Sequence, residues 1–553
     1  MDRRQFLTLS PARQKTVKAP FGRTLSGINA YTGTWGTAQQ VHLLKRALFG
    51  ASPADLAWVK GLTMDQAVDA LLTPVAAANY PQPPVNNYGD DATGIAPGAT
   101  WVNSAPYTDN DDLDRGRRNS YKAWWLGVML NQTRSIHEKM VLFWHNHFVT
   151  ETQTVTDLRY VYKYNTVLRQ NALGNFNALT KAITLDPAML IYLNGYLNGK
   201  EAADENYARE LHELFTVGKG PDSHYTEEDV RATARVLTGW RVNANTITSY
   251  FDATQHDFSN KEFSAFYGEK QVSGQSGPNG GLMELNDLID NVIFKQPEVS
   301  KFIVRKIYKF FIYYQIDDAV EQNVIAPLAE IFRNNNYNIL PVLSTLFRSE
   351  HFYDPLNMSC LIKSPIEFCV GLCREYSVAF PPAASYDMAY EKWDFVRQYA
   401  GSMLQDIGDP PLVAGWDAYY LEPQCHELWI NTDTFPKRNR FSDALVSGQG
   451  GAMGLTIDVL AFADQLSDPS NPVTLVNDSL DLLYRIDVST NLRAWLKNQI
   501  LLSGQSPNSD YYWTDAWNAY KASPGDANLK AVVESRLRLL YKYIMNLSEY
   551  QLS

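Results

Sequence analysis

Residues 136–148, Ile136-His137-Glu138-Lys139-Met140-Val141-Leu142-Phe143-Trp144-His145-Asn146-His147-Phe148, place three histidines and an acid in an apolar run. We predict a helix over 133–147. On that helix Glu138 and His145 share a face two turns apart, about 10.5 Å along the axis, which is too far for one metal ion without a third element. His145 and His147 face one side only if the helix ends at Trp144 and the chain then extends. If the helix continues, one histidine caps its C-terminus and the other is a hydrogen-bonded core group.

Histidines are concentrated around this segment. The chain contains nine, and six of them lie in the stretch from 137 to 256: His137, His145, His147, His212, His224 and His256. Histidine titrates near neutral pH and is the commonest metal ligand in proteins. Together with the neighbouring carboxylates, these residues make this region the best candidate for chemistry.

Helical signals extend outward from this segment in both directions. Ser52-Pro53 combines an N-cap with a proline at the first helical position, and Thr226-Glu227-Glu228-Asp229 combines an N-cap with acids in the first turn. We predict that helices begin at Ser52 and at Thr63-Met64-Asp65-Gln66. We predict further helices over 38–49, 118–131, 133–147, 156–172, 175–184, 203–217, 226–238, 282–294, 297–314, 318–334, 338–348, 362–378, 386–404, 456–465, 475–486, 490–501 and 526–547. The fold class is therefore mainly α, a large multi-helix, bundle-like body.

One part of the chain breaks the helical pattern. Residues 242–248 have the composition of a strand, and residues 273–281 are a Gly/Ser/Pro loop, so we expect a small irregular or β-containing insertion near 240–281. The expected organisation is a flexible N-terminal leader (1–35), a helical core with the His and Glu motifs (36–240), the insertion (241–281), a helical region (282–405), and a loop-rich segment followed by C-terminal helices (406–553). We expect residues 36–553 to form one integrated body.

The composition restricts the function classes. The chain has 553 residues, of which 45% are hydrophobic and 20% charged, as in ordinary folded proteins. Its net charge of −11 disfavours nonspecific binding to nucleic acid, so we expect no nucleic-acid partner. Its four cysteines are too few for a disulfide scaffold of this size. The most apolar stretch, 302–316, is interrupted by Arg305, Lys306 and Lys309, and we expect no membrane span.

The N-terminus carries part of a targeting signal. Arg3-Arg4-Gln5-Phe6-Leu7 resembles the twin-arginine export motif, but the following residues, 10–15, are polar where an apolar stretch should stand. A basic N-terminal tail explains the same residues. We therefore expect a cytoplasmic location by default, with periplasmic export through Arg3 and Arg4 as the alternative.

Two further clusters of polar residues accompany the histidines. On a helix over 203–217, Asn206, Arg209, Glu210 and Glu213 fall within one arc of about 100°. This arc is either a solvated face or a stripe facing a cleft, in which Glu210 would be a general base or metal ligand and Arg209 its orienting partner or an anion clamp.

The second cluster, Asp252, His256, Asp257 and Lys261, lies in the irregular segment, where functional residues often gather. By contrast, the sequence lacks a P-loop, a Gly-rich dinucleotide fingerprint, a Gly-x-Ser-x-Gly elbow and a His-Glu-x-x-His motif. These absences argue against nucleotide-dependent enzymes, serine hydrolases and ordinary zinc proteases.

Several of these motifs together resemble a known family, the bacterial domain of unknown function numbered eighteen hundred. The motifs are Phe143-Trp144-His145-Asn146-His147-Phe148, Asn206-Tyr207-Ala208-Arg209-Glu210-Leu211 through Phe215, Tyr225-Thr226-Glu227-Glu228-Asp229-Val230, Leu237-Thr238-Gly239-Trp240, His256-Asp257 with Lys261, Arg305-Lys306-Ile307-Tyr308-Lys309-Phe310-Phe311, Pro410-Pro411 with Gly415-Trp416, and Trp429-Ile430-Asn431. The resemblance runs from about residue 40 to the C-terminus, where residues 546–552 resemble forms from Bacteroidetes-like bacteria. It implies a mostly helical protein, often encoded beside a sulfatase- or phosphatase-like companion, and no established reaction. The chain departs from the commoner pattern by an insertion at 417–426 and by His212, which stands where an aliphatic residue is expected.

Three hypotheses for function remain open. The first is a metal-dependent hydrolase in which His145, His147 and His256, with Asp257 or Glu210, bind Zn, Mn or Fe, and a metal-bound water attacks a phosphate, sulfate or glycosyl bond. The second is a metal-independent carbohydrate-active enzyme that uses Glu210 and Asp257 as acid and base. The third is a non-catalytic helical partner or escort of the companion sulfatase- or phosphatase-like protein. The candidate residues are Glu210, Asp257, Arg209 and Lys261 as catalytic groups, His145, His147 and His256 as metal ligands, and Asn206, Trp144, Trp240 and Trp416 as substrate-binding residues.

Overall fold

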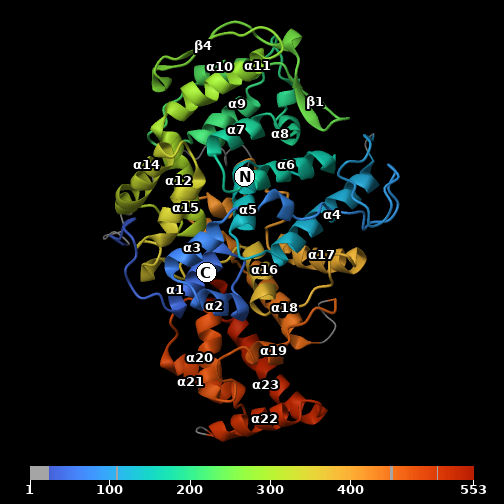
Figure 1. The fold of residues 1–553 in the computed structure, drawn as a ribbon, viewed down its shortest axis with the longest axis vertical. Helices are drawn as coiled ribbons and strands as arrows, with labels where there is room; N and C mark the ends of the chain where they lie inside the picture. The colour runs from blue at the N-terminus through green and yellow to red at the C-terminus, as the bar shows by residue number, and fades with distance from the viewer. Residues whose placement is uncertain (1–23, 108–109, 449–452, 507–508) are drawn as a thin grey trace, which may run out of the picture.

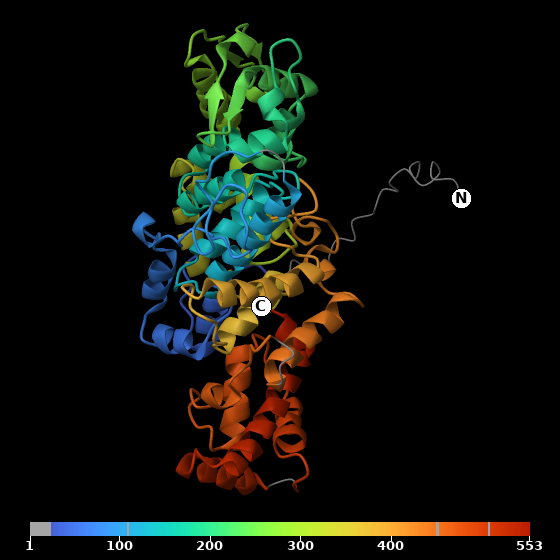
Figure 2. The same ribbon diagram turned by 90° about the vertical axis from the view of Figure 1, so that its right-hand side faces the viewer.

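The computed structural model of the chain describes residues 24–107, 110–448, 453–506 and 509–553. Most of these residues are in helices, and the only regular strands among them are two short antiparallel pairs. The predicted mainly α class is therefore confirmed. The molecule is elongated, with the strands and α7–α11 at one end and α19–α23 at the other (Figures 1 and 2). The Arg3-Arg4 motif and most of the predicted leader lie outside the described residues.

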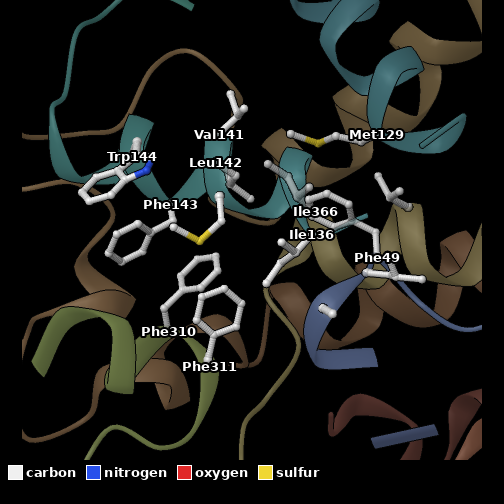
Figure 3. Packing of buried hydrophobic residues seen from close by; sticks show 14 of the residues in the cluster. Phe49, Met129, Ile136, Val141, Leu142, Phe143, Trp144, Phe310, Phe311 and Ile366 are labelled. Carbon is white, nitrogen blue, oxygen red and sulfur yellow. The ribbon is translucent and has the colours of Figure 1, made fainter. Parts of the chain in front are cut away.

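Helix α5 (His137–His147) is the buried centre of the fold. Its apolar side chains Val141, Leu142, Phe143 and Trp144 are 0–3% exposed. Figure 3 shows Phe143 beside Phe310 and Phe311 of α12, in a cluster that also includes Ile366 of α16, Met129 of α4 and Phe49, which follows α1. Each such side chain contributes about 1.5–3 kcal/mol when it is fully buried, so this packing fixes α5 against four other parts of the chain.

Besides α5, the described first half of the chain contains nine further α-helices and a π-helix. They are α1 (Thr37–Ala47), α2 (Pro53–Lys60), α3 (Met64–Leu72), α4 (Asp111–Leu130), α6 (Leu158–Gln170), α7 (Phe176–Thr184), α8 (Pro187–Tyr192), α9 (Asn206–Glu210) with the π-helix η4 (Leu211–Thr216), and α10 (Glu227–Val236). Helix α4 begins seven residues before its predicted start because Asn110 caps it and three acids occupy its first turn.

The insertion contains strands, as predicted, but the single strand predicted over 242–248 is wrong, because residues 244–247 form the turn between two strands. Strands β1 (Trp240–Asn243) and β2 (Thr248–Phe251) form a hairpin in which Trp240 faces Phe251, and β3 (Lys261–Glu262) pairs with β4 (Gln271–Val272). Both pairs lie at one end of the molecule in Figure 1. The chain then returns to helices at α11 (Gly280–Asp287).

The second half is also helical, and two of the three α-helices that we did not predict lie in it. The elements are α11 with η7 (Leu288–Val292), α12 (Pro297–Phe311), α13 (Asp318–Val320) with η9 (Glu321–Ile325), α14 (Ala326–Asn334), α15 (Ile339–Arg348), α16 (Pro365–Glu375), α17 (Tyr386–Ser402), α18 (Thr434–Ser447), α19 (Val459–Ala463), α20 (Pro472–Leu483), α21 (Thr490–Trp495) with η13 (Leu496–Leu501), α22 (Asp510–Ala522) and α23 (Ala527–Asn546). The unpredicted helices are α8, α18 and α22. Helix α22 is rich in Tyr and Trp, which have weak intrinsic helix propensity, and Trp513 and Trp517 stabilise it by burial.

Both ends of the described chain are tied to the body. The C-terminus returns to the middle of the molecule (Figure 1), where the amide of Ser553 donates to the carbonyl of Leu361 at 2.9 Å. Near the other end, Ser26 Oγ donates to Asp354 Oδ2 at 2.9 Å, and the amide of Tyr31 donates to the carbonyl of Arg348 at 2.8 Å. Residues 24–35, which we expected to be flexible, are thus held against the segment that follows α15. Among the described helices, none has both the length and the apolar character needed to cross a membrane.

Candidate functional site: a lysine cavity beside the central helix

A cavity of about 550 Å³ lies between the C-terminal end of α5, helix α12 and the loop around 414–422. We call it the lysine cavity. Its wall includes Phe143, His147, Phe302, Lys306, Lys309 and Tyr419. A volume of this size is typical of small-molecule sites.

The sequence of α12 explains how the lysines reach the cavity. Pro297 occupies the first helical position, and Ile303, Ile307 and Phe311 are buried in the core. Lys306 and Lys309 lie on a different face, together with Phe302 one turn earlier, and all three line the cavity. The charges that interrupt this apolar helix therefore face a cavity instead of the core.

The amine of Lys306 is fixed by two hydrogen bonds. Its Nζ lies 3.1 Å from Nδ1 of His147 and 3.1 Å from the carbonyl oxygen of Leu214. Nε2 of His147 lies 3.1 Å from the carbonyl oxygen of Phe215, which can only accept, so Nε2 carries the hydrogen and Nδ1 accepts from Lys306. An ammonium group has three donor positions, so these two hydrogen bonds leave one of them unused, and Nζ also lies 4.8 Å from the centre of the Phe302 ring.

The other cations of the cavity are paired with acids. Arg305 contacts Glu298 and lies 2.7 Å from Glu321, and Lys309 lies 2.7 Å from Glu422. Lys301 lies 3.5 Å from Asp222, and two further acids, Asp317 and Asp318, also line the cavity. Among the described carboxylates, none lies within ion-pair distance of Lys306.

Burial, reinforced by the positive charge of Lys309, lowers the pKa of Lys306 to about 7. Near neutral pH this residue therefore exchanges between ammonium and amine, as an acid–base catalyst must.

His147 has a structural and orienting role in this geometry. Burial, and then the charge of Lys306, lower the pKa of its ring well below the usual value. The neutral ring is held between Phe215 and Lys306, and therefore positions the amine of Lys306.

His145 lies in a different environment because α5 continues to His147 and does not stop at Trp144. Its ring packs against Trp125 and Trp416, with centroid distances of 5.1 and 5.8 Å, and neither ring nitrogen has a hydrogen-bond partner. Burial lowers its pKa to about 3. Joint metal binding by His145 and His147 would require the helix to end at Trp144, and α5 does not end there.

The structure brings His256 and Lys261 together, but in a closed network. His256 Nε2 lies 3.0 Å from Glu284 Oε1, and Lys261 Nζ lies 2.5 Å from Glu284 Oε2, with all three side chains fully buried. Lys261 also donates to the backbone carbonyl of Asp257, whose carboxylate is 2.7 Å from Arg235. This network ties the insertion to α11. We did not predict Glu284, which has no distinctive sequence motif.

The predicted polar stripe on α9 lies at the surface. Arg209 is paired with Glu205 and Glu227 at 3.1 and 2.7 Å, and Asn206 is exposed. Glu210 is half-buried, and its burial and the nearby Glu213 raise its pKa. Glu210 and Asp257, the predicted acid and base, thus have separate sets of partners.

The three predicted stacking tryptophans are core residues. Trp144, Trp240 and Trp416 are 1–7% exposed. The indole N–H of Trp144 donates to the carbonyl of Ala172 at 3.0 Å. None of the three presents an open aromatic face to solvent.

The predicted metal ligands do not converge. His145, His147 and His256 occupy the three environments described above, and within the described part of the chain no group of three or more His, Cys, Asp or Glu side chains is arranged to hold a metal ion. Of the predicted metal ligands, only His147 lines the candidate cavity, and the sequence analysis did not single out Lys306. The available signal was the set of charges in the otherwise apolar stretch 302–316, which we used only to exclude a membrane span.

Comparison with known proteins agrees with the resemblance noted in the sequence. The model of one family, described as "Protein of unknown function (DUF1800)", matches residues 42–552. Neither the curated proteins nor the solved structures yield a match. Since the family model covers nearly the whole chain, the protein belongs to this family of unknown function.

Proposed function

We propose that the lysine cavity is the substrate site of a hydrolase that acts on small phosphate or sulfate esters, with Lys306 as its acid–base group. The observation that carries the proposal is Lys306, which lines the cavity, has one donor position that neither hydrogen bond uses, and has no carboxylate partner among the described residues. An anionic ester would supply the missing negative charge.

The proposed reaction needs only proton transfer at this amine. Lys306 in its ammonium form binds an anionic oxygen of the ester and donates a proton to the leaving oxygen as the P–O or S–O bond breaks. The oxygen of a water molecule forms the new bond, and the proton that this water loses returns to Lys306. A pKa of about 7 suits both steps, because acid and base forms are then both populated at neutral pH.

The other hypotheses gain less support from the geometry. The metal-dependent mechanism lacks a gathered ligand set among the described residues, and the acid and base of the carbohydrate mechanism, Glu210 and Asp257, have separate partners. The escort role stays a prediction.

Activity against 4-nitrophenyl phosphate and 4-nitrophenyl sulfate tests the proposal, with and without EDTA. We expect turnover that EDTA does not abolish, and a loss of about 100-fold or more in kcat/KM for Lys306→Met. Lys306→Arg should keep binding but lose kcat, because an arginine does not release its proton near pH 7. The matched control is Lys437→Met, which removes a surface lysine paired with Asp433.

Three results would overturn the proposal. Full activity of Lys306→Met would remove the lysine from the chemistry. Loss of activity in EDTA, restored by Zn, Mn or Fe, would favour the metal-dependent mechanism. Wild-type protein that neither hydrolyses these esters nor binds inorganic phosphate or sulfate in calorimetry would leave the escort role.

A further inference from the structure

Asn146, the residue before His147 at the end of α5, offers the lysine cavity a hydrogen-bond donor of fixed orientation. Its side chain is half-buried and lines the cavity. Its Oδ1 lies 2.9 Å from the main-chain nitrogen of Trp416. That nitrogen can only donate, so the amide atom that faces it is the oxygen, and the Nδ2 group with its two N–H donors points away from Trp416.

The Nδ2 group of Asn146 is open to a ligand. It has no hydrogen-bond partner among the described residues and, unlike the ring nitrogens of His145, it is not buried. Because Oδ1 is covered by Trp416 and the side chain lines the cavity, Nδ2 is the polar atom that Asn146 presents there. A donor that is already held in one orientation loses little conformational freedom when an acceptor binds.

The Gly415-Trp416 motif of the sequence explains why this orientation is fixed. Gly415 has a φ of +101°, and an added Cβ would lie 2.4 Å from Oδ1 and 2.7 Å from the carbonyl oxygen of Asn146. Any larger residue would therefore displace the amide, and only glycine lets this loop lie against the end of α5. The amide of the next residue, Trp416, then holds Oδ1 in place.

Asn146 and Lys306 meet in the same part of the lysine cavity. Nζ of Lys306 lies 3.1 Å from Nδ1 of His147, and His147 directly follows Asn146 in the chain. An ammonium group and an amide N–H are both donors, so together they suit two oxygens of one phosphate or sulfate group.

The acids that line the cavity are either exposed or already engaged. Three of them are exposed and lie on its solvent side: Asp222, Asp318 and Glu422. The other two have partners among the described residues, since Oδ1 of Asp317 accepts from the amide of Val320 and Glu321 is paired with Arg305. A single anionic group can pass the exposed acids, whereas a polyanion would stay beside them and be repelled.

Aromatic rings form a continuous apolar surface beside the two donors. The ring of Phe143 lies 5.4 Å from that of Phe310, which lies 5.5 Å from that of Tyr419. The ring of Phe302 lies 4.8 Å from Nζ of Lys306, and all four rings line the cavity. Such a surface favours a flat apolar group attached to the anion. A sugar would leave hydroxyl groups without partners against these rings.

We propose that the lysine cavity binds aryl esters, with the anionic group on Nδ2 of Asn146 beside Lys306, and with the aromatic group of the ester against the four rings. This substrate class rests on the hydrolase proposed for the same cavity. Asn146 is then a substrate-binding residue, and Gly415 and Trp416 are its positioning residues.

Binding of phosphonates tests the proposal separately from catalysis, because their P–C bond takes the place of the ester bond that a hydrolase would break. Titration calorimetry compares phenylphosphonate with methylphosphonate, which carries the same anionic group without the ring. We expect phenylphosphonate to bind about tenfold or more tightly, because only its ring buries apolar surface. Phe302→Leu, which replaces a half-buried ring of the cavity, should reduce that difference.

Asn146→Asp is the variant that tests the donor itself. It keeps the shape of the side chain and an oxygen that accepts from the amide of Trp416, but it replaces Nδ2 with a carboxylate oxygen. Phenylphosphonate binding should weaken by about tenfold or more. Urea unfolding checks that the variant is folded. Asn528→Asp, at an exposed position in the first turn of α23, adds the same charge and should leave binding unchanged.

The outcomes separate this proposal from that of the hydrolase. Folded Asn146→Asp that binds phenylphosphonate like wild type, or wild type that binds methylphosphonate equally tightly, overturns the aryl ester site even when Lys306-dependent hydrolysis of 4-nitrophenyl esters is found. Wild type that binds neither phosphonate also overturns it. Binding that behaves as expected, without turnover of either 4-nitrophenyl ester, supports the site and overturns the hydrolase.

Discussion

His137 and His147 stand at the two ends of α5, and each lines a different cavity. Ten residues of helix separate them by about 15 Å. The same buried helix thus contributes to the wall of the lysine cavity at one end and to the wall of a second, aromatic cavity at the other end. Because α5 is packed on all sides, substitutions in one cavity should leave the shape of the other unchanged.

Lys306→Met should make the free energy of unfolding depend less on pH above pH 7. The pKa of Lys306 is lowered to about 7 in the folded state, whereas an unfolded lysine titrates near 10.4, so between these values the unfolded chain binds more protons. Stability therefore rises with pH across this window, by up to about 1.4 kcal/mol per pH unit from this group. Urea unfolding at pH 7, 8 and 9 should show a smaller rise for Lys306→Met than for wild type. An equal rise in both proteins would mean that Lys306 is ionised normally; Lys437→Met is the control.

His145→Phe should reduce the loss of stability that the protein undergoes as the pH falls below 6.5. The folded pKa of His145 is about 3, and an unfolded histidine titrates near 6.5, so stability from this group is complete above pH 6.5 and is lost as the pH falls toward 3. Phenylalanine fits the aromatic surroundings and breaks no hydrogen bond, so the variant should stay within about 1.5 kcal/mol of wild type at pH 7.

Urea midpoints at pH 7, 6 and 5 measure this effect. The wild type should lose about 1.4 kcal/mol per pH unit more than His145→Phe once the pH is below 6. His224, which is exposed, provides the matched control as His224→Gln. Parallel pH curves for wild type and His145→Phe would contradict the prediction.

Removing only the carboxylate of Glu284 should destabilise the fold more than removing the charges of both Glu284 and Lys261. Glu284→Ala leaves the ammonium of Lys261 buried without its carboxylate, which we expect to destabilise the fold by about 3–5 kcal/mol. The double variant Lys261→Met/Glu284→Ala should recover part of that loss, because the two sites share one interaction. Chemical unfolding of both singles and the double variant gives the coupling energy. Glu262→Ala, at the exposed neighbour of Lys261, is the control; additive losses would show that the ion pair is not a unit.

Patterns among neighbouring residues predicted most of the helices, whereas the candidate site depends on contacts between residues that are far apart in the sequence. Helices that begin with a capping residue followed by proline or acids, as at Ser52 and Thr226, were predicted within a residue or two, because capping is a property of neighbouring residues. Helix α22 was missed because burial of its tryptophans, not propensity, stabilises it. The role proposed for Lys306 could not be predicted from the sequence, because it depends on the distances between Lys306 and the carboxylates in the folded protein. Likewise, the helix predicted over 133–147 does end at His147, but the sequence could not show that the rings of His145 and His147 lie in different surroundings.

Gly50→Ala should destabilise the packing of the turn after α1 against α16. Gly50 has a φ of +80°, and an added Cβ would lie 2.7 Å from the carbonyl oxygen of Gly371, which is backbone and cannot rotate away. Backbone strain and overpacking together predict a loss of about 2–4 kcal/mol. Gly89→Ala is the matched control, because Gly89 also has a positive φ, +99°, but an added Cβ would have no neighbour within 4 Å. Denaturant unfolding should therefore show a loss of only about 1–2 kcal/mol for Gly89→Ala. Equal losses for the two variants would mean that the contact between Gly50 and Gly371 is looser than 2.7 Å implies.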